Sequence, residues 1–188
     1  MEAILKREVI SSKALCRVLG VSVFIIMTAL GAFVRIPLPF TPVPLTLQTF
    51  FVLLSGAALG GGLGASSQMG YILLGLAGMP IFSGAGSGLF YALGPTGGYL
   101  IGFVLASYLV GNYIKRAGTS FSGVFLAVFL ADLALLVCGV IWLKFVLGQS
   151  LGRLLFVGFL PFIPGDLLKA YAVTKIYFKL KPRLKSVF

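Results

Sequence analysis

The strongest constraint on this chain is a stretch of 79 residues, from Ile36 to Ile114, that contains no Asp, Glu, Lys or Arg. A helix needs about 20 apolar residues to cross a bilayer, so this stretch alone is long enough for three crossings. Of the 188 residues, 59% are hydrophobic and only 10% are charged, whereas soluble domains carry about 25% charged residues. The sequence therefore predicts one membrane-embedded domain over residues 1–188.

Prolines, glycines and charged residues divide the chain into six apolar segments. Prolines between residues 37 and 44 end the first segment, because proline removes a backbone donor and fixes φ. Glycines at 60–64 permit a tight reversal, and those at 83–88 form a loop that cannot stay helical. We therefore expect an all-α integral membrane protein with six transmembrane helices, at residues 15–34, 45–59, 66–76, 95–114, 122–147 and 151–178.

The basic residues indicate the orientation of these helices. The formal net charge is +11, and most Lys and Arg residues lie before the first span, after the last span, or at Lys115 and Arg116. Cytoplasmic segments of membrane proteins are rich in Lys and Arg, so we expect both termini and the loop at 115–116 to be cytoplasmic. Arg35, Lys144 and Arg153 are exceptions. Aromatic residues do not alternate with the cations as in an RNA-stacking surface, so nucleic acid is not expected as a partner.

The residue content argues against catalysis. The chain has no histidine, which excludes Ser-His hydrolysis and histidine metal sites. It has two cysteines, both in apolar segments, and only four acidic residues. Neither a disulfide framework nor a carboxylate cluster for a metal is indicated. We expect a protein that is not an enzyme and has no metal or cofactor.

Three ionisable residues inside the apolar segments mark candidate functional sites, because charge is costly in a membrane. Asp166 and Lys169 are one helical turn apart and project from one helix face. They either neutralise each other or line a cavity for a polar ligand, and we favour the cavity because Pro164 and Gly165 break the helix just before them. Asp132 stands alone on the fifth segment, where pairing with a cation or a hydroxyl group of a neighbouring helix is the simpler interpretation.

Four motifs, in order, carry a resemblance to a known family. They span Thr41–Gly56, Leu93–Phe103, Gly139–Leu143 and Pro164–Lys169. With these motifs the chain resembles the biotin-specific substrate-binding (S) components of energy-coupling-factor (ECF) transporters, the BioY family. The resemblance implies a multi-pass cell-membrane protein that binds biotin as its transported ligand. It further implies a membrane-spanning coupling (T) component and cytoplasmic ATPase subunits as partners, since this chain has no phosphate-binding loop of its own.

The resemblance also suggests ligand-binding residues. Asp166 and Lys169 match the acid and lysine of the family, and the donors and acceptor of the biotin ureido ring complement them. The remaining candidates are a polar residue at the second span, three aromatic residues for the apolar part of biotin, and two loop serines: Gln48, Phe82, Tyr91, Tyr99, Ser83 and Ser87. The sequence leaves open which end of biotin meets Lys169. Some relatives carry an amide or a cation near the third loop, whereas residues 81–100 here have neither.

Two other functions remain open from the sequence. Asp132 and Asp166 could act as relay groups in a self-contained ion- or proton-coupled carrier, although the halves of the chain show no convincing repeat. A structural scaffold is the third possibility. A surface for a coupling subunit is suggested only by the small-residue spacings of Cys16 with Gly20 and of Thr28 with Ala32 on the first segment.

Overall fold

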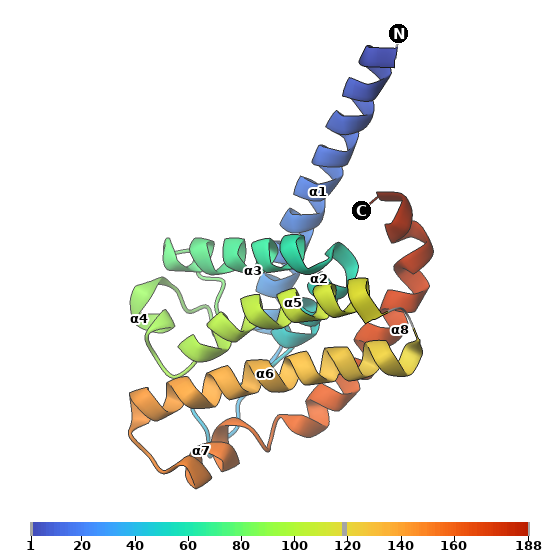
Figure 1. Ribbon diagram of the computed structural model, residues 1–188. Helices are drawn as coiled ribbons and strands as arrows, with labels where there is room; N and C mark the ends of the chain where they lie inside the picture. Colours follow the sequence, from blue (N-terminus) through green and yellow to red (C-terminus); the bar gives the residue numbers. More distant parts are fainter. Residues whose placement is uncertain (1, 118–119, 188) are drawn as a thin grey trace.

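The computed structural model describes residues 2–117 and 120–187, and most of these residues are helical (Figure 1). The helices are α1 (Glu2–Phe33), α2 (Gln48–Leu59), α3 (Gly61–Leu76), α4 (Gly88–Ala92), α5 (Gly97–Ala117), α6 (Phe121–Leu147), α7 (Leu151–Gly158) and α8 (Ile163–Val187). Two short strands, β1 (Arg35–Ile36) and β2 (Leu45–Thr46), pair antiparallel. Figure 1 shows α3, α5 and α6 running side by side, with the first turns of α1 projecting beyond the bundle.

The helices differ in whether they can span a membrane. Within the described residues, Lys13–Phe33, Gly97–Arg116 and Phe121–Leu147 are long and apolar enough, and α7 with α8 makes a fourth span if this pair, bent by 48°, is taken together. The 12 residues of α2 extend for about 18 Å and the 16 residues of α3 for about 24 Å, less than the roughly 30 Å of a bilayer core. The structure thus supports three or four of the six predicted spans.

Several helix boundaries differ from the predicted ones, and three of these differences have a clear local cause. The second helix begins at Gln48 and not at residue 45, because Leu45 and Thr46 pair with β1. The third begins at Gly61 and not at residue 66, since Gly60 alone, with a φ of 83°, makes the reversal. The sixth is interrupted at residues 159–162 and continues as α8. The antiparallel pair of strands β1 and β2 and the small helix α4 were not predicted.

Polar side chains join α1 to the bundle. Thr28 Oγ1 donates a hydrogen bond to Gln68 Oε1 at 3.3 Å, and Gln68 Nε2 donates to Ser55 Oγ at 3.1 Å. All three side chains are fully buried, and each bond satisfies groups that would be costly to leave unpaired. Thr28 and Ala32 are both buried within this chain, so this small-residue pair packs internally and is not available to a partner.

Basic residues from three helices gather at one end of the bundle. Arg17 of α1, Lys115 of α5 and Lys181 of α8 line one hollow of about 640 Å³ together with the reversal at residues 60–62. Arg17 lies near the start of the apolar span Lys13–Phe33 of α1, so the start of this span, the end of α5 and the last turns of α8 lie on the same side of the protein. This is the arrangement that the charge pattern predicts for one membrane face.

Candidate ligand-binding site

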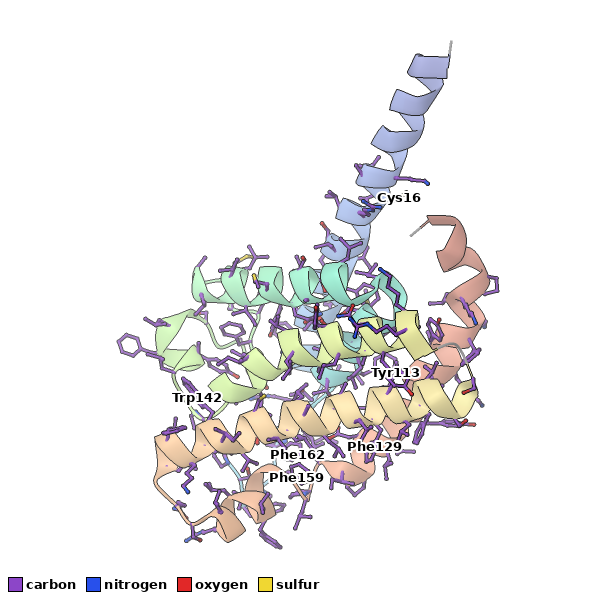
Figure 2. The ribbon with its side chains drawn as sticks, viewed as in Figure 1. Cys16, Tyr113, Phe129, Trp142, Phe159 and Phe162 are labelled. Carbon is purple, nitrogen blue, oxygen red and sulfur yellow. The ribbon has the colours of Figure 1, made fainter. Side chains whose placement is uncertain are left out.

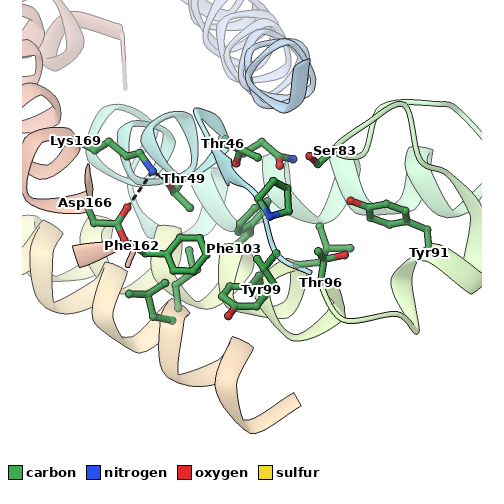
Figure 3. Close-up of a pocket in the computed structure, with 16 residues that line it drawn as sticks. Thr46, Thr49, Ser83, Tyr91, Thr96, Tyr99, Phe103, Phe162, Asp166 and Lys169 are labelled. Carbon is green, nitrogen blue, oxygen red and sulfur yellow. Dashed lines mark hydrogen bonds and ion pairs between the residues drawn. The ribbon is translucent and has the colours of Figure 1, made fainter. Parts of the chain in front are cut away.

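A cavity lies at the end of the bundle opposite to these basic residues, between α2, α5, α6, α8 and the two loops that precede α2 and α5 (Figure 3). It is lined by Val43, Pro44, Thr46, Gln48, Thr49, Ser83, Tyr91, Thr96, Tyr99, Leu100, Phe103, Leu135, Leu136, Phe162, Asp166 and Lys169. The volume of the cavity is about 40 Å³. A larger ligand therefore requires its lining to move apart.

The charged end of the cavity is built by the start of α8. Lys169 Nζ donates hydrogen bonds to Asp166 Oδ1 at 2.9 Å and to Thr49 Oγ1 of α2 at 2.7 Å. Asp166 lies in the first turn of α8, where the helix dipole favours an anion. Its second oxygen, Oδ2, is buried with no partner among the described residues. Since an ammonium group has three donors, this end of the cavity retains both a free donor and a free acceptor.

Aromatic residues form the middle of the cavity. Figure 3 shows Tyr99, Phe103 and Phe162 between the charged pair and the loop end. The Tyr99 hydroxyl donates a hydrogen bond to the Gly158 carbonyl at 2.7 Å, which fixes the ring beside the break between α7 and α8. The ring also lies directly against Gly139 of α6, where a Cβ atom would collide with it. Figure 2 shows Phe162 between α6 and this break.

The other end of the cavity is polar and lies under the loops. Ser83 Oγ is buried there without a partner in the described part of the chain, close to Tyr91 and Thr96 (Figure 3). A second, outer hollow shares Ser83, Tyr91 and Thr96 with the cavity and adds Arg35 from β1. The guanidinium of Arg35 lies against Gly84. Arg35 therefore places a positive charge beside the polar end of the cavity. The third loop itself has no cationic residue.

Six of the eight predicted site residues line the cavity. These are Gln48, Ser83, Tyr91, Tyr99, Asp166 and Lys169. Phe82 is fully buried behind them, where it stacks on Tyr91 at a ring-centroid distance of 5.0 Å. Ser87 is exposed at the N-cap of α4. Phe82 thus supports Tyr91 from behind, and Ser87 lies outside the lining.

Several lining residues were not predicted from the sequence. Thr49 contacts Lys169 directly, and Thr96 and Phe162 contribute to the loop end and the aromatic middle. Thr49 could have been predicted as a site residue, because it belongs to a polar group at the start of an otherwise apolar segment, together with Thr46 and Gln48. Phe162 carries no such signal, because aromatic residues are frequent throughout the chain.

Asp132 of α6 lies just beyond the cavity lining. Its side chain is fully buried, and neither carboxyl oxygen has a hydrogen-bond partner among the described residues. It precedes Leu135 and Leu136, which line the cavity, by one helical turn on the same helix face. Its carboxyl group lies close to the Asp166 carboxyl group of α8. The predicted pairing with a cation or hydroxyl of a neighbouring helix is not found among the described residues.

The fold and the cavity together define a multi-pass membrane protein with an internal site suited to a small amphipathic molecule. The model of the BioY family matches residues 6–186 of the chain. A probable biotin transporter BioY of Pyrococcus horikoshii is 39% identical over 152 residues, which cover 80% of this chain and 86% of that protein. The chain belongs to the BioY family.

Other relatives agree with this assignment. The biotin transporter BioY of Thermotoga maritima is 38% identical over 160 residues, covering 85% of this chain and 92% of that protein. A probable biotin transporter BioY of Lysinibacillus sphaericus is 51% identical over 96 residues, but these span only 47% of its length.

A solved structure is also similar to this chain. The crystal structure of "the S-component for biotin from an ECF-type ABC transporter" has a TM-score of 0.83 and 29% identity, and covers 88% of this chain and 90% of that chain. The predicted family is confirmed, and with it the expectation of a transport protein and not an enzyme.

Proposed function

We propose that this chain binds biotin in the cavity between α2, α5, α6 and α8 and serves as the substrate-binding subunit of an ECF-type biotin importer. The observation that carries the proposal is the layout of the cavity, with the Asp166–Lys169 pair at one end, an aromatic middle, and Ser83 under Arg35 at the other. Biotin has the same order of chemistry, since a ureido ring and a carboxylate stand at opposite ends of an apolar body. The names of the relatives support biotin as the ligand.

The proposed orientation places the ureido ring at Asp166 and Lys169. The ring has two N–H donors and one carbonyl acceptor, which match the free acceptor of Asp166 and the free donor of Lys169. The valerate carboxylate then lies under the loops, where Ser83 Oγ is unpartnered among the described residues and Arg35 supplies a positive charge. Charge-assisted hydrogen bonds to carboxylate are strong, and Arg35 takes the place of the amide or cation that residues 81–100 lack.

The proposed topology has six passes with cytoplasmic termini within a single domain over residues 1–188. The shared hollow of Arg17, Lys115 and Lys181 supports it, because it groups the basic ends of three helices on one side. α2 and α3 would then be short passes. The partners in this proposal are a membrane coupling component and cytoplasmic ATPases, which the printed description of the similar structure supports. Biotin is the transported ligand, and no cofactor is involved.

The test is biotin binding by the purified protein in detergent. Lys169→Met keeps the apolar stem but removes the ammonium group, so Asp166 loses its ion pair and the ligand loses a charge-assisted hydrogen bond. One such bond contributes about 1.5–3 kcal/mol, which corresponds to a loss of affinity of roughly 10- to 100-fold. Isothermal titration calorimetry measures this directly.

Lys175→Met is the matched control, since Lys175 lies on the same helix but its ammonium group stands over the exposed ring of Tyr171. The control should bind biotin like the wild type. If the Lys169 variant and the control bound biotin with equal affinity, this result would contradict the assignment of Lys169 to the biotin-binding site. If biotin neither binds nor raises the melting temperature of the wild type, the whole proposal fails, and a scaffold or an ion-coupled carrier becomes the better interpretation.

A further inference from the structure

We infer that Asp132 is a positioning residue for the biotin site: it carries a proton and donates a hydrogen bond to the Oδ2 oxygen of Asp166. The inference deepens the proposed function and rests on it for the identity of the ligand. It concerns a residue outside the cavity lining, and it gives a role to the buried acid of the chain that the ligand does not touch.

The first observation is that Asp132 lacks partners. The side chain is 0% exposed, and both Oδ1 and Oδ2 are without a hydrogen bond in the described part of the chain. An isolated buried carboxylate is very costly, so such a group takes up a proton instead. A protonated carboxyl group is neutral and also gains one O–H donor.

The second observation is the position of the matching acceptor. Asp166 Oδ1 is occupied by Lys169, whereas Oδ2 is buried and has no partner within residues 2–117 and 120–187. The two carboxyl groups lie close to each other on helices α6 and α8, which pack together. Two carboxylates can share such a contact only when one of them holds a proton. One hydrogen bond from Asp132 to Oδ2 therefore satisfies both residues.

The charge balance assigns the proton to Asp132 and not to Asp166. Asp166 has the ammonium group of Lys169 at 2.9 Å and lies in the first turn of α8, and both features stabilise a carboxylate. Asp132 lies in the interior of α6, far from either helix end. Among the described residues, the titratable groups that act on this pair are Lys169 on α8 and Tyr99 on α5. With one proton on Asp132, the two acids and Lys169 together are neutral.

The consequence is that Asp132 sets the orientation of the Asp166 carboxylate. A hydrogen bond to Oδ2 from behind and the ion pair at Oδ1 hold the plane of the carboxylate fixed. Each carboxylate oxygen accepts two hydrogen bonds, so one acceptor position on each oxygen stays free for the N–H groups of the ligand. Without Asp132 the carboxylate could rotate, and the ligand would lose affinity although no contact to it was removed.

The test compares two substitutions that differ in one property. Asp132→Asn keeps the shape and an N–H donor, whereas Asp132→Leu has a similar volume and no donor. We expect the Asn variant to bind biotin within about threefold of the wild type and the Leu variant to bind at least tenfold more weakly. Equal weakening in both variants, or normal binding by the Leu variant, would overturn the inference.

A second measurement does not require biotin or the Leu variant to fold. The infrared spectrum of the wild type at pH 7, minus that of the Asn variant, should contain the carbonyl band of a protonated carboxyl group. At high pH the wild type should lose affinity as this band disappears, while the Asn variant keeps its affinity. Absence of the band at pH 7 refutes the role of Asp132, whereas failure of the proposed function would show as a wild type that has the band but does not bind biotin.

Discussion

The substitution Gly139→Ala tests whether the Tyr99 ring is fixed in the position that shapes the cavity. A Cβ atom at Gly139 would lie 2.5 Å from Tyr99 Cδ1 and closer still to two other ring atoms. Ordinary contact begins near 3.4 Å, so the ring must move away by about 1 Å. Its hydroxyl is held by the 2.7 Å hydrogen bond to Gly158, and the cavity that it lines has a volume of only about 40 Å³.

The magnitude follows from these contacts. Overpacking of this kind costs typically 1–3 kcal/mol, and a strained or broken hydrogen bond adds about 1 kcal/mol. We expect the melting temperature in detergent to fall by roughly 4–16 °C. Since Tyr99 also lines the cavity, the displaced ring should lower biotin affinity by at least tenfold.

The assay is thermal unfolding in detergent combined with biotin titration. Gly62→Ala is the matched control, because Gly62 is also helical but has no atom within 4 Å of the position that an alanine methyl group would take. In the double variant Gly139→Ala/Tyr99→Leu the smaller side chain should recover much of the lost stability, and the two changes should not be additive. A Gly139→Ala variant with wild-type melting temperature and affinity would refute the reasoning.

Two further predictions concern the ends of the cavity. Thr49→Val should weaken biotin binding several-fold, because the Lys169 ammonium group loses the hydroxyl that accepts its 2.7 Å hydrogen bond. Thr49→Ser keeps the hydroxyl and should bind biotin normally. Equal affinities of the two variants in calorimetry would contradict a role for the hydroxyl. Arg35→Gln should weaken biotin binding but leave the uncharged biotin methyl ester unaffected, with the exposed Arg153→Gln as control. A similar loss for both ligands would argue against a carboxylate under Arg35.

The sequence predicted the helical regions well but not the exact helix ends. The lengths of the uncharged segments and the positions of the prolines and glycines between them predicted every long helix. These features act locally, so a single segment reveals them. The start of α2 depends on the pairing of Leu45 and Thr46 with β1, which is a contact across the proline-rich loop. The early start of α3 after the reversal at Gly60 brings Gly64 directly against Gly56 of α2. Such tertiary contacts leave no trace in a single segment.

The site was predictable to the extent that its residues are chemically unusual. Asp166 and Lys169 are rare charges in an apolar chain, so membrane energetics alone singles them out. Arg35 was assigned only to the end of a span, since nothing in the sequence shows that β1 brings it over Ser83 and Gly84. Phe82 has the expected residue type, but packing places it behind Tyr91. Residue type gives the chemistry, whereas only the fold gives the direction of a side chain.

The hydroxyl group of Tyr71 connects the cavity wall to the third loop. It accepts a hydrogen bond from Gln48 Nε2 and donates one to the carbonyl oxygen of Ile81 at 3.0 Å. Gln48 lines the cavity, so its one side-chain amide group can hydrogen-bond either to this hydroxyl or to a ligand in the cavity. If a ligand drew the Gln48 amide toward itself, the Tyr71 hydroxyl would lose the hydrogen bond that Gln48 donates to it. Because the same hydroxyl binds the Ile81 carbonyl, occupancy of the cavity would be coupled to the third loop.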